Sequence, residues 1–209
     1  MLQACRRLTN RAALWLALPL SALAGASHAE SAESVEEKAT LCATCHGENG
    51  IPQEKTTPVI WGQNEGYLYL QLRDFKSGAR MNEQMSPIAA TLEKEEMQAL
   101  AAHFTSLKWP DLQQPQAPKD VADKAIAANT SVGCTGCHLD QWQGNGTTAR
   151  LAGQRREYLA KTIAEFRDRT RANNPGMSDL MRATPLDDLK AHAEYLAGLQ
   201  ILGSTDNGR

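Results

Sequence analysis

Apolar side chains recur three and four residues apart over several segments of the chain, which is the spacing of amphipathic helices. The expected helices begin near Ser34, Asn64 and Thr91 in the first half of the chain, and near Lys119, Gln154 and Thr184 in the second half. No stretch alternates apolar and polar residues in the manner of a half-buried strand. The pattern therefore predicts an all-α fold.

The two halves of the chain repeat each other. Trp61-Gly62-Gln63 followed by Tyr67-Leu68 matches Ala152-Gly153-Gln154 followed by Tyr158-Leu159 at an offset of 91 residues. Self-similarity over this length predicts two homologous domains. We expect them at residues 30–109 and 120–209, joined at residues 110–119 by an extended linker rich in Pro and Gln.

The first 29 residues have the pattern of a secretory signal peptide. Three arginines and no acid precede an apolar run from Ala12 to Ala24, and Ser27-His28-Ala29 fits a cleavage site. We expect export to the periplasm and cleavage near Ala29, and an uncleaved membrane anchor is the alternative. Removal of residues 1–29 would change the net charge from −2 to −5, because three basic residues leave.

Composition limits the class of protein further. Only 5% of the residues are aromatic, so a small helical domain here is short of bulky core side chains. We expect each domain to pack around another large apolar group. A net charge of −2 excludes the usual nucleic-acid binder, which needs a strongly basic face.

The motif CxxCH occurs twice, and it is the strongest indication of the protein's chemistry. Its residues are Cys42, Cys45 and His46 in the first repeat and Cys134, Cys137 and His138 in the second. The pattern is typical of covalent c-type haem attachment, in which two thiols bond the haem vinyl groups and the histidine binds the iron. Zinc and disulfides are the alternatives. Paired zinc hooks lie far closer together than these motifs, and they need no His at the same following position.

A second axial ligand has to come from elsewhere in each repeat. The candidates in the two repeats are Met81, Met85, Met97, His103, Met177, Met181 and His192. Only Met85 and Met177 match each other in the repeat alignment, whereas His192 matches Leu100. We predict that Met85 and Met177 are the ligands, in a loop before the third helix of each repeat, and core packing is the alternative for every methionine.

His/Met ligation favours one kind of function. A neutral, soft thioether stabilises ferrous iron, and two filled axial positions leave no place for oxygen or peroxide. We therefore expect an electron carrier and not an enzyme. An enzyme of the dihaem peroxidase kind would need an open position, and a thiosulfate-oxidising dihaem enzyme would need a further cysteine.

At this point the sequence resembles the dihaem cytochromes c of the cytochrome c4 family. The two CxxCH motifs, the pattern GQxxxYL…F at Gly62–Phe75 and Gly153–Phe166, and the Met85 and Met177 segments carry the resemblance. It implies two class I cytochrome c folds, each around a covalent haem and related by a pseudo-twofold axis. It also implies that the carbonyl of Pro58 orients the haem-binding histidine, a position at which the second repeat has Ala149.

The resemblance implies a periplasmic carrier of single electrons. Its partners would be redox proteins: a quinol-oxidising complex or dehydrogenase as donor, and a terminal oxidase or reductase as acceptor. Membrane contact is expected only through these partners. The alternative is a bound cytochrome subunit of a dehydrogenase, such as a flavocytochrome c sulfide dehydrogenase.

Five arginines of the second repeat cluster around one expected helix, namely Arg155, Arg156, Arg167, Arg169 and Arg171. One interpretation is a surface that steers a partner by charge. The alternative is a set of arginines on a solvated helix face or paired with haem propionates.

Overall fold

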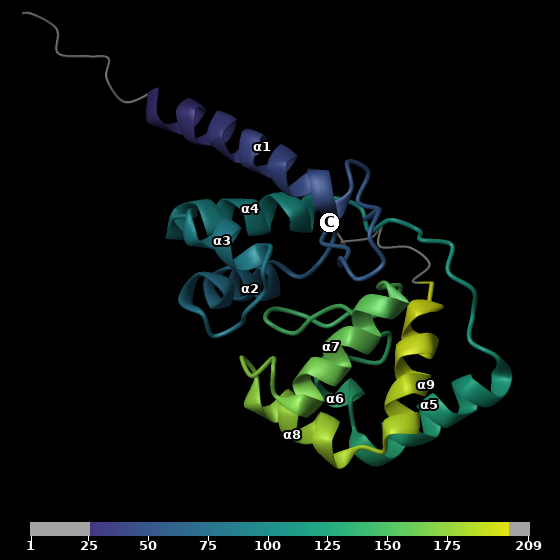
Figure 1. Ribbon diagram of the computed structural model, residues 1–209. Coiled ribbons are helices and arrows are strands. Elements are labelled where there is room, and N and C mark those ends of the chain that lie inside the picture. Colours follow the sequence, from purple (N-terminus) through teal and green to yellow (C-terminus); the bar gives the residue numbers. More distant parts are fainter. Residues whose placement is uncertain (1–25, 201–209) are drawn as a thin grey trace, which may run out of the picture.

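The computed structural model describes residues 26–200, and all regular structure in that range is helical (Figure 1). The helices are α1 (Ala26–His46), α2 (Glu65–Ser77), α3 (Met85–Ala90), α4 (Lys94–Ser106), α5 (Lys119–Val132), α6 (Thr135–His138), α7 (Arg156–Asp168), α8 (Pro175–Ala183) and α9 (Leu186–Ala197). The predicted all-α class is confirmed. Residues 1–25 of the predicted signal peptide lie outside the described residues, and no helix within residues 26–200 is both long and apolar enough to span a membrane.

Helix packing follows the internal repeat. The helix pairs with the closest packing are α1 with α4, α2 with α3 and α2 with α4 in the first repeat. In the second repeat they are α5 with α9, α7 with α8 and α7 with α9. In Figure 1 these groups form two separate bundles, α1–α4 and α5–α9, connected by one long segment.

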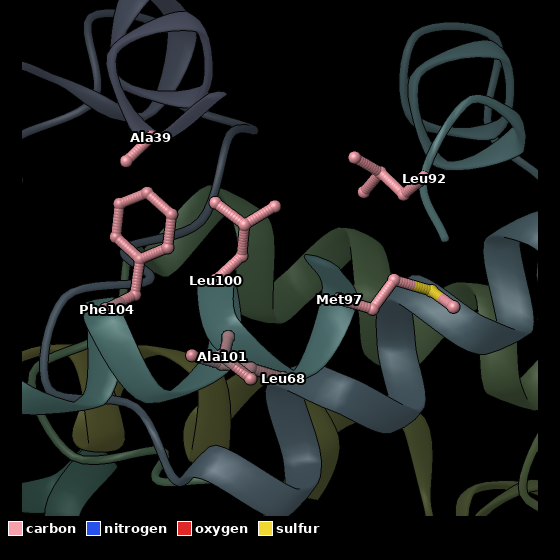
Figure 2. Close-up of a cluster of buried hydrophobic side chains, with 7 residues drawn as sticks. All are labelled: Ala39, Leu68, Leu92, Met97, Leu100, Ala101 and Phe104. Atoms are coloured by element: carbon pink, nitrogen blue, oxygen red, sulfur yellow. The ribbon is translucent and has the colours of Figure 1, made fainter. Parts of the chain in front are cut away.

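Each bundle has its own small apolar core. Figure 2 shows that of the first bundle, where Ala39 of α1 and Leu68 of α2 lie around the inner face of α4. The face of α4 carries Met97, Leu100, Ala101 and Phe104, and each is at most 4% exposed. The spacing of three and four residues along α4 is what places these four side chains on one face.

Helix ends follow local side-chain chemistry more closely than the apolar pattern does. Helix α2 starts after Asn64 and stops at Gly78, whose φ of +78° is left-handed, as the sequence predicts. Helix α4 starts at Lys94 and not near Thr91, because the Glu96 carboxylate accepts the Glu93 N–H at 2.8 Å and closes the first turn there.

The start of the first helix also differs from the prediction. The backbone of α1 is helical from Ala26, so Ser34 lies inside the helix and does not begin it. The segment is rich in Ala and Glu and has no Gly or Pro before the first motif, so nothing in it favours a break at Ser34.

The connecting segment is extended and fixed to the second bundle. Residues 108–118 contain no helix. The Trp109 ring is buried beneath the Arg150 guanidinium, 4.2 Å from its centroid. The Gln114 amide donates to the carbonyl of Gln154 at 2.9 Å and accepts the N–H of Arg156 at 3.0 Å.

Two buried glutamines, one in each repeat, join the bundles. Each makes the same pair of hydrogen bonds to one backbone residue of the other repeat. The Gln154 side chain accepts the N–H of Val59 at 2.9 Å and donates to its carbonyl at 3.0 Å. The Gln63 side chain accepts the N–H of Arg150 at 2.7 Å and donates to its carbonyl at 2.9 Å. Both pairs match at the repeat offset of 91 residues, so the contact has the reciprocity of a pseudo-twofold axis.

Two arginines repeat this reciprocity farther along the contact. Arg80 lies over the Phe75 ring and donates to the hydroxyl of Tyr158 at 3.3 Å. Arg171 lies over the Phe166 ring and donates to the hydroxyl of Tyr67 at 3.2 Å. The tyrosine in each pair belongs to the opposite repeat, so the predicted pseudo-twofold relation is present in side-chain contacts as well as in the sequence.

We predict that Gln154→Ala lowers the free energy of unfolding by about 2 kcal/mol or more, because each buried backbone group left without a partner costs about 1–3 kcal/mol. Guanidinium unfolding of the haem-loaded protein measures the change. Gln141→Ala is the control, because that side chain is exposed and lies outside the contact. Equal effects of the two substitutions would contradict the role assigned to Gln154.

Candidate haem sites

The first candidate site lies at the end of α1. Cys42 is half-buried against the core cluster of the first bundle, and Cys45 is exposed. The His46 side chain is buried, and its Nδ1 lies 2.8 Å from the carbonyl oxygen of Pro58. A carbonyl can only accept, so Nδ1 carries the proton and Nε2 keeps a free lone pair for a metal.

The second candidate site has the same donors on a different local backbone. Helix α5 ends at Gly133, which has a φ of +77°, and the short helix α6 then carries the motif as far as His138. The Nδ1 of His138 lies 2.9 Å from the carbonyl oxygen of Ala149. A carbonyl therefore orients this histidine too, although Ala replaces Pro.

Burial affects the protonation of these groups. It lowers the pKa of both His46 and His138, against the opposing effect of the carbonyl bond. Both imidazoles are therefore held in the neutral form that binds metals. Burial raises the pKa of the thiols of Cys42 and Cys134, and none of the four motif cysteines is paired in a disulfide.

The two methionines lie at helix starts, so the predicted loop position is wrong. Met85 is the first residue of α3, and Met177 is the third residue of α8. In both repeats an asparagine three residues earlier accepts the methionine N–H: Asn82 at 2.9 Å and Asn174 at 3.1 Å. Asn174 is the N-cap of α8, whereas Asn82 precedes α3, whose N-cap is Gln84. The same side-chain bond therefore holds the methionine backbone in both repeats, and in the second repeat it also caps the helix.

Met85 and Met177 are both half-buried. Met177 packs against the buried cluster of Phe166, Met181 and Leu189. Met85 is half-buried, whereas the nearby Met81 is 69% exposed. Met97 and Met181 are buried core residues, as the alternative interpretation of those two positions expects.

The residues present fit a haem. Each motif offers two thiols and one imidazole nitrogen, and the methionine predicted as second ligand in the same repeat offers a thioether; together they are the donor set of a c-type haem with two axial ligands. The buried Nε1 of Trp61, a residue packed against the same cluster as Cys42, has no acceptor among the described residues. A buried N–H needs an acceptor, and a haem brings carboxylate groups that can supply one.

The second repeat lacks three glycines that the first repeat uses at left-handed positions. Leu139, Trp142 and Arg169 have φ values of +63°, +57° and +67°, and they occupy the places of Gly47, Gly50 and Gly78. Residues with a Cβ adopt such angles at a cost of about 1–2 kcal/mol. The backbone that leads away from His138 is therefore more strained than the backbone that leads away from His46.

The two repeats have their tryptophan at different positions of the same region. In the first repeat the Trp61 ring lies so close over Gly50 that a Cβ there would approach it to 2.6 Å. In the second repeat Trp142 replaces the glycine and Ala152 replaces Trp61, and both belong to one buried cluster. Each site therefore has one indole, supplied from opposite sides of the same contact.

The arginine cluster of the second repeat is bonded within the protein. Arg171 is buried and Arg155 donates to the carbonyl of Pro52. Arg167 donates to the Thr184 carbonyl at 2.8 Å, and Arg169 donates to the Asp179 carboxylate at 3.0 Å. These partners favour a structural role over a free steering surface.

Sequence reasoning missed several residues that build the sites. The repeat offset pairs Asn82 with Asn174 and Gln63 with Gln154, but the apolar pattern assigns none of them a role. The shared spacing NxxMS in both repeats is the signal that could have identified the asparagines. Helix α2 begins after Asn64 as the sequence predicts, but the Asn64 side chain donates to the carbonyls of Gln143 and Thr148 in the other repeat and does not cap the helix.

We predict that Leu139→Gly raises the free energy of unfolding by about 1 kcal/mol, because it relieves a φ of +63° with ψ of +165°, a region that strongly favours glycine. Gly47→Ala should lower it by more than about 1 kcal/mol, because its Cβ would lie 2.3 Å from the carbonyl oxygen of Ile51. Denaturant unfolding tests both, and a loss of stability in Leu139→Gly would show that the strain is not released.

Comparison with known proteins gives consistent results. No family model matches the chain. The chain is 35% identical over 174 residues to a thiosulfate dehydrogenase electron acceptor of Stutzerimonas stutzeri, covering 77% of this chain and 80% of that protein. It is 31% identical over 209 residues to cytochrome c4 of Azotobacter vinelandii, covering 91% and 99%. The structure of cytochrome c4 from Acidithiobacillus ferrooxidans superimposes with a TM-score of 0.70 at 29% identity, covering 77% of this chain and 99% of that one.

Proposed function

Because this chain belongs to the cytochrome c4 family of dihaem c-type cytochromes, we propose that it carries single electrons between redox proteins of the periplasm. Members of this family hold two covalently bound haem c groups. The proposal divides the mature chain into haem domains at residues 30–109 and 120–209.

The proposed attachment and axial residues are those of the two motifs and the two matching methionines. Cys42, Cys45, Cys134 and Cys137 would form thioethers with the haem vinyl groups, while Nε2 of His46 and His138 and the sulfur of Met85 and Met177 would face iron. The observation that carries the proposal is the match between repeats, in which each histidine bonds a backbone carbonyl and each methionine donates its N–H to the asparagine three residues earlier.

The protein itself supplies orientation and exclusion of water. A bound haem c supplies reversible uptake of one electron per iron. The carbonyl bonds of His46 and His138 hold each imidazole in one tautomer, so no proton needs to move at the ligand. With both axial places filled, the site is suited to electron transfer and not to reaction with oxygen or peroxide.

The name of one relative favours a dehydrogenase as donor. The Stutzerimonas stutzeri protein, which is 35% identical, is a thiosulfate dehydrogenase electron acceptor. We propose that a periplasmic dehydrogenase of this kind reduces the present protein, and that a terminal oxidase or reductase reoxidises it. The alternative is a permanently bound cytochrome subunit of such an enzyme, and stable copurification with a catalytic subunit would identify it.

Periplasmic location is part of the same proposal. Three arginines before the apolar run Ala12–Ala24 and the site near Ala29 support export and cleavage. N-terminal sequencing of the purified protein tests it, and a mature chain that begins near Glu30 is the expected result.

We predict that Met85→Ala and Met177→Ala each move one of the two reduction couples to a markedly lower potential and leave the other in place, because loss of the thioether removes a ligand that stabilises ferrous iron. Potentiometric titration of the haem-loaded protein, followed through haem absorption, measures both couples. Met81→Ala is the control, because Met81 is 69% exposed and has no counterpart in the second repeat. Unchanged couples in Met85→Ala or Met177→Ala would remove that residue from the ligand set.

We also predict that a purified thiosulfate dehydrogenase, given thiosulfate, reduces the oxidised protein until two electrons per chain have been accepted. Stopped-flow absorption measures the stoichiometry and rate. Thiosulfate without the dehydrogenase is the control and should produce no reduction. Turnover of thiosulfate by the isolated protein would contradict the carrier role.

A further inference from the structure

His192 is a buried histidine with one ring nitrogen left without a partner. The residue lies in α9 and is 5% exposed. Its Nδ1 lies 2.9 Å from the carbonyl oxygen of Asp188, one turn earlier, so Nδ1 carries the proton. Its Nε2 has no hydrogen-bond partner in the part of the chain that the structure describes. A buried lone pair without a donor lowers the free energy of unfolding, so its presence here points to a function.

The ring of His192 is connected to the second haem site by an indole. Trp142 is 5% exposed and lies nearly parallel to the His138 ring, with centroids 6.4 Å apart and planes at 28°. On Trp142 the His192 ring packs edge to face, with centroids 5.9 Å apart and planes at 72°. Three rings therefore follow one another from the proposed iron ligand to α9.

The first repeat has no ring at the places of Trp142 and His192. Leu100 occupies the place of His192 and is 1% exposed in the core of the first bundle (Figure 2). Gly50 occupies the place of Trp142. The motifs, the carbonyl bonds and the asparagine bonds to the methionine N–H are the same in both repeats, so this pair of differences separates two sites that otherwise share their donors.

The charges next to His192 compensate each other. The carboxylate of Asp188 pairs with the Lys124 ammonium of α5 at 3.8 Å, and it is the Asp188 backbone, not its side chain, that accepts from the imidazole. The imidazole is thus the polar group on the inner face of α9, where Leu189, Ala193 and Leu196 are apolar and buried.

We propose that His192 holds the reduction potential of the second haem below the value it would have with leucine at this position. Oxidised haem carries one more positive charge than reduced haem. A fixed lone pair in a low-dielectric interior stabilises the oxidised form, which lowers the potential. The effect is electrostatic, so it needs no contact between His192 and the iron, and the inference rests on the proposed ligation of the second haem by His138.

The experiment compares both reduction couples of the haem-loaded protein with those of His192→Leu, His192→Gln and Leu100→His. All measurements are made at the same pH. Nuclear magnetic resonance of partly reduced samples assigns each couple to its haem, with Met177→Ala marking the second one. Long-range proton–nitrogen spectra report the tautomer of His192, which should be protonated at Nδ1.

We expect His192→Leu to raise the potential of the second couple and leave the first unchanged. His192→Gln retains a polar oxygen and should give a smaller rise. Leu100→His introduces the lone pair into the first repeat and should lower the first couple. This reciprocal variant keeps the inference testable if His192→Leu folds poorly, and unfolding midpoints identify such a case.

Several outcomes would overturn the inference. They are an unchanged or lowered second couple in a folded His192→Leu protein, an equal shift of both couples, or a rise of the first couple in Leu100→His. Absence of a second couple in the unsubstituted protein would instead overturn the proposed function, and this inference with it.

Discussion

The bond from each motif histidine to a backbone carbonyl is the constraint on which the two sites depend. The carbonyls of Pro58 and Ala149 orient His46 and His138. The residues that follow them, Val59 and Arg150, each bond a glutamine of the other repeat through the backbone N–H and carbonyl. In each repeat, one backbone residue therefore orients the motif histidine, and the next residue holds the two bundles together. Movement of the bundles against each other would disturb the histidines, so the contact and the ligand geometry form one mechanical unit.

The two repeats reach similar sites with different local structure. The first repeat uses glycine where the backbone is left-handed and carries its motif on one continuous helix, α1. The second repeat interrupts the helix at Gly133 and places Leu139 and Trp142 in left-handed conformations. Inequality of the two sites is thus built into the backbone as well as into the side chains.

Much of the architecture could be predicted from the sequence, because it depends on periodic patterns. The all-α class, the repeat, four of the six expected helix starts and the two CxxCH motifs follow from patterns along the chain. The starts at Met85 and near Met177 do not, because one asparagine bond to a methionine N–H has little effect on apolar periodicity. The position of Arg155 does not follow either, because its acceptor, the Pro52 carbonyl, lies 103 residues away. The glutamine contact joins residues 87 to 95 positions apart, and no local pattern marks such a partner.

The reciprocal glutamine bonds have a consequence for how such a chain could arise. Gln63 of the first repeat bonds Arg150 of the second, and its counterpart Gln154 bonds Val59, the counterpart of Arg150. Such a contact is isologous, the kind of interface that two identical subunits form about a twofold axis. One repeat that held both halves of this contact would complement a second copy of itself. The segment of residues 108–118 then acts as a tether, which makes the pairing intramolecular and independent of protein concentration. In this sense the chain is a covalently linked pseudo-dimer. Once its two halves were joined, their sequences could differ while the contact between them was kept.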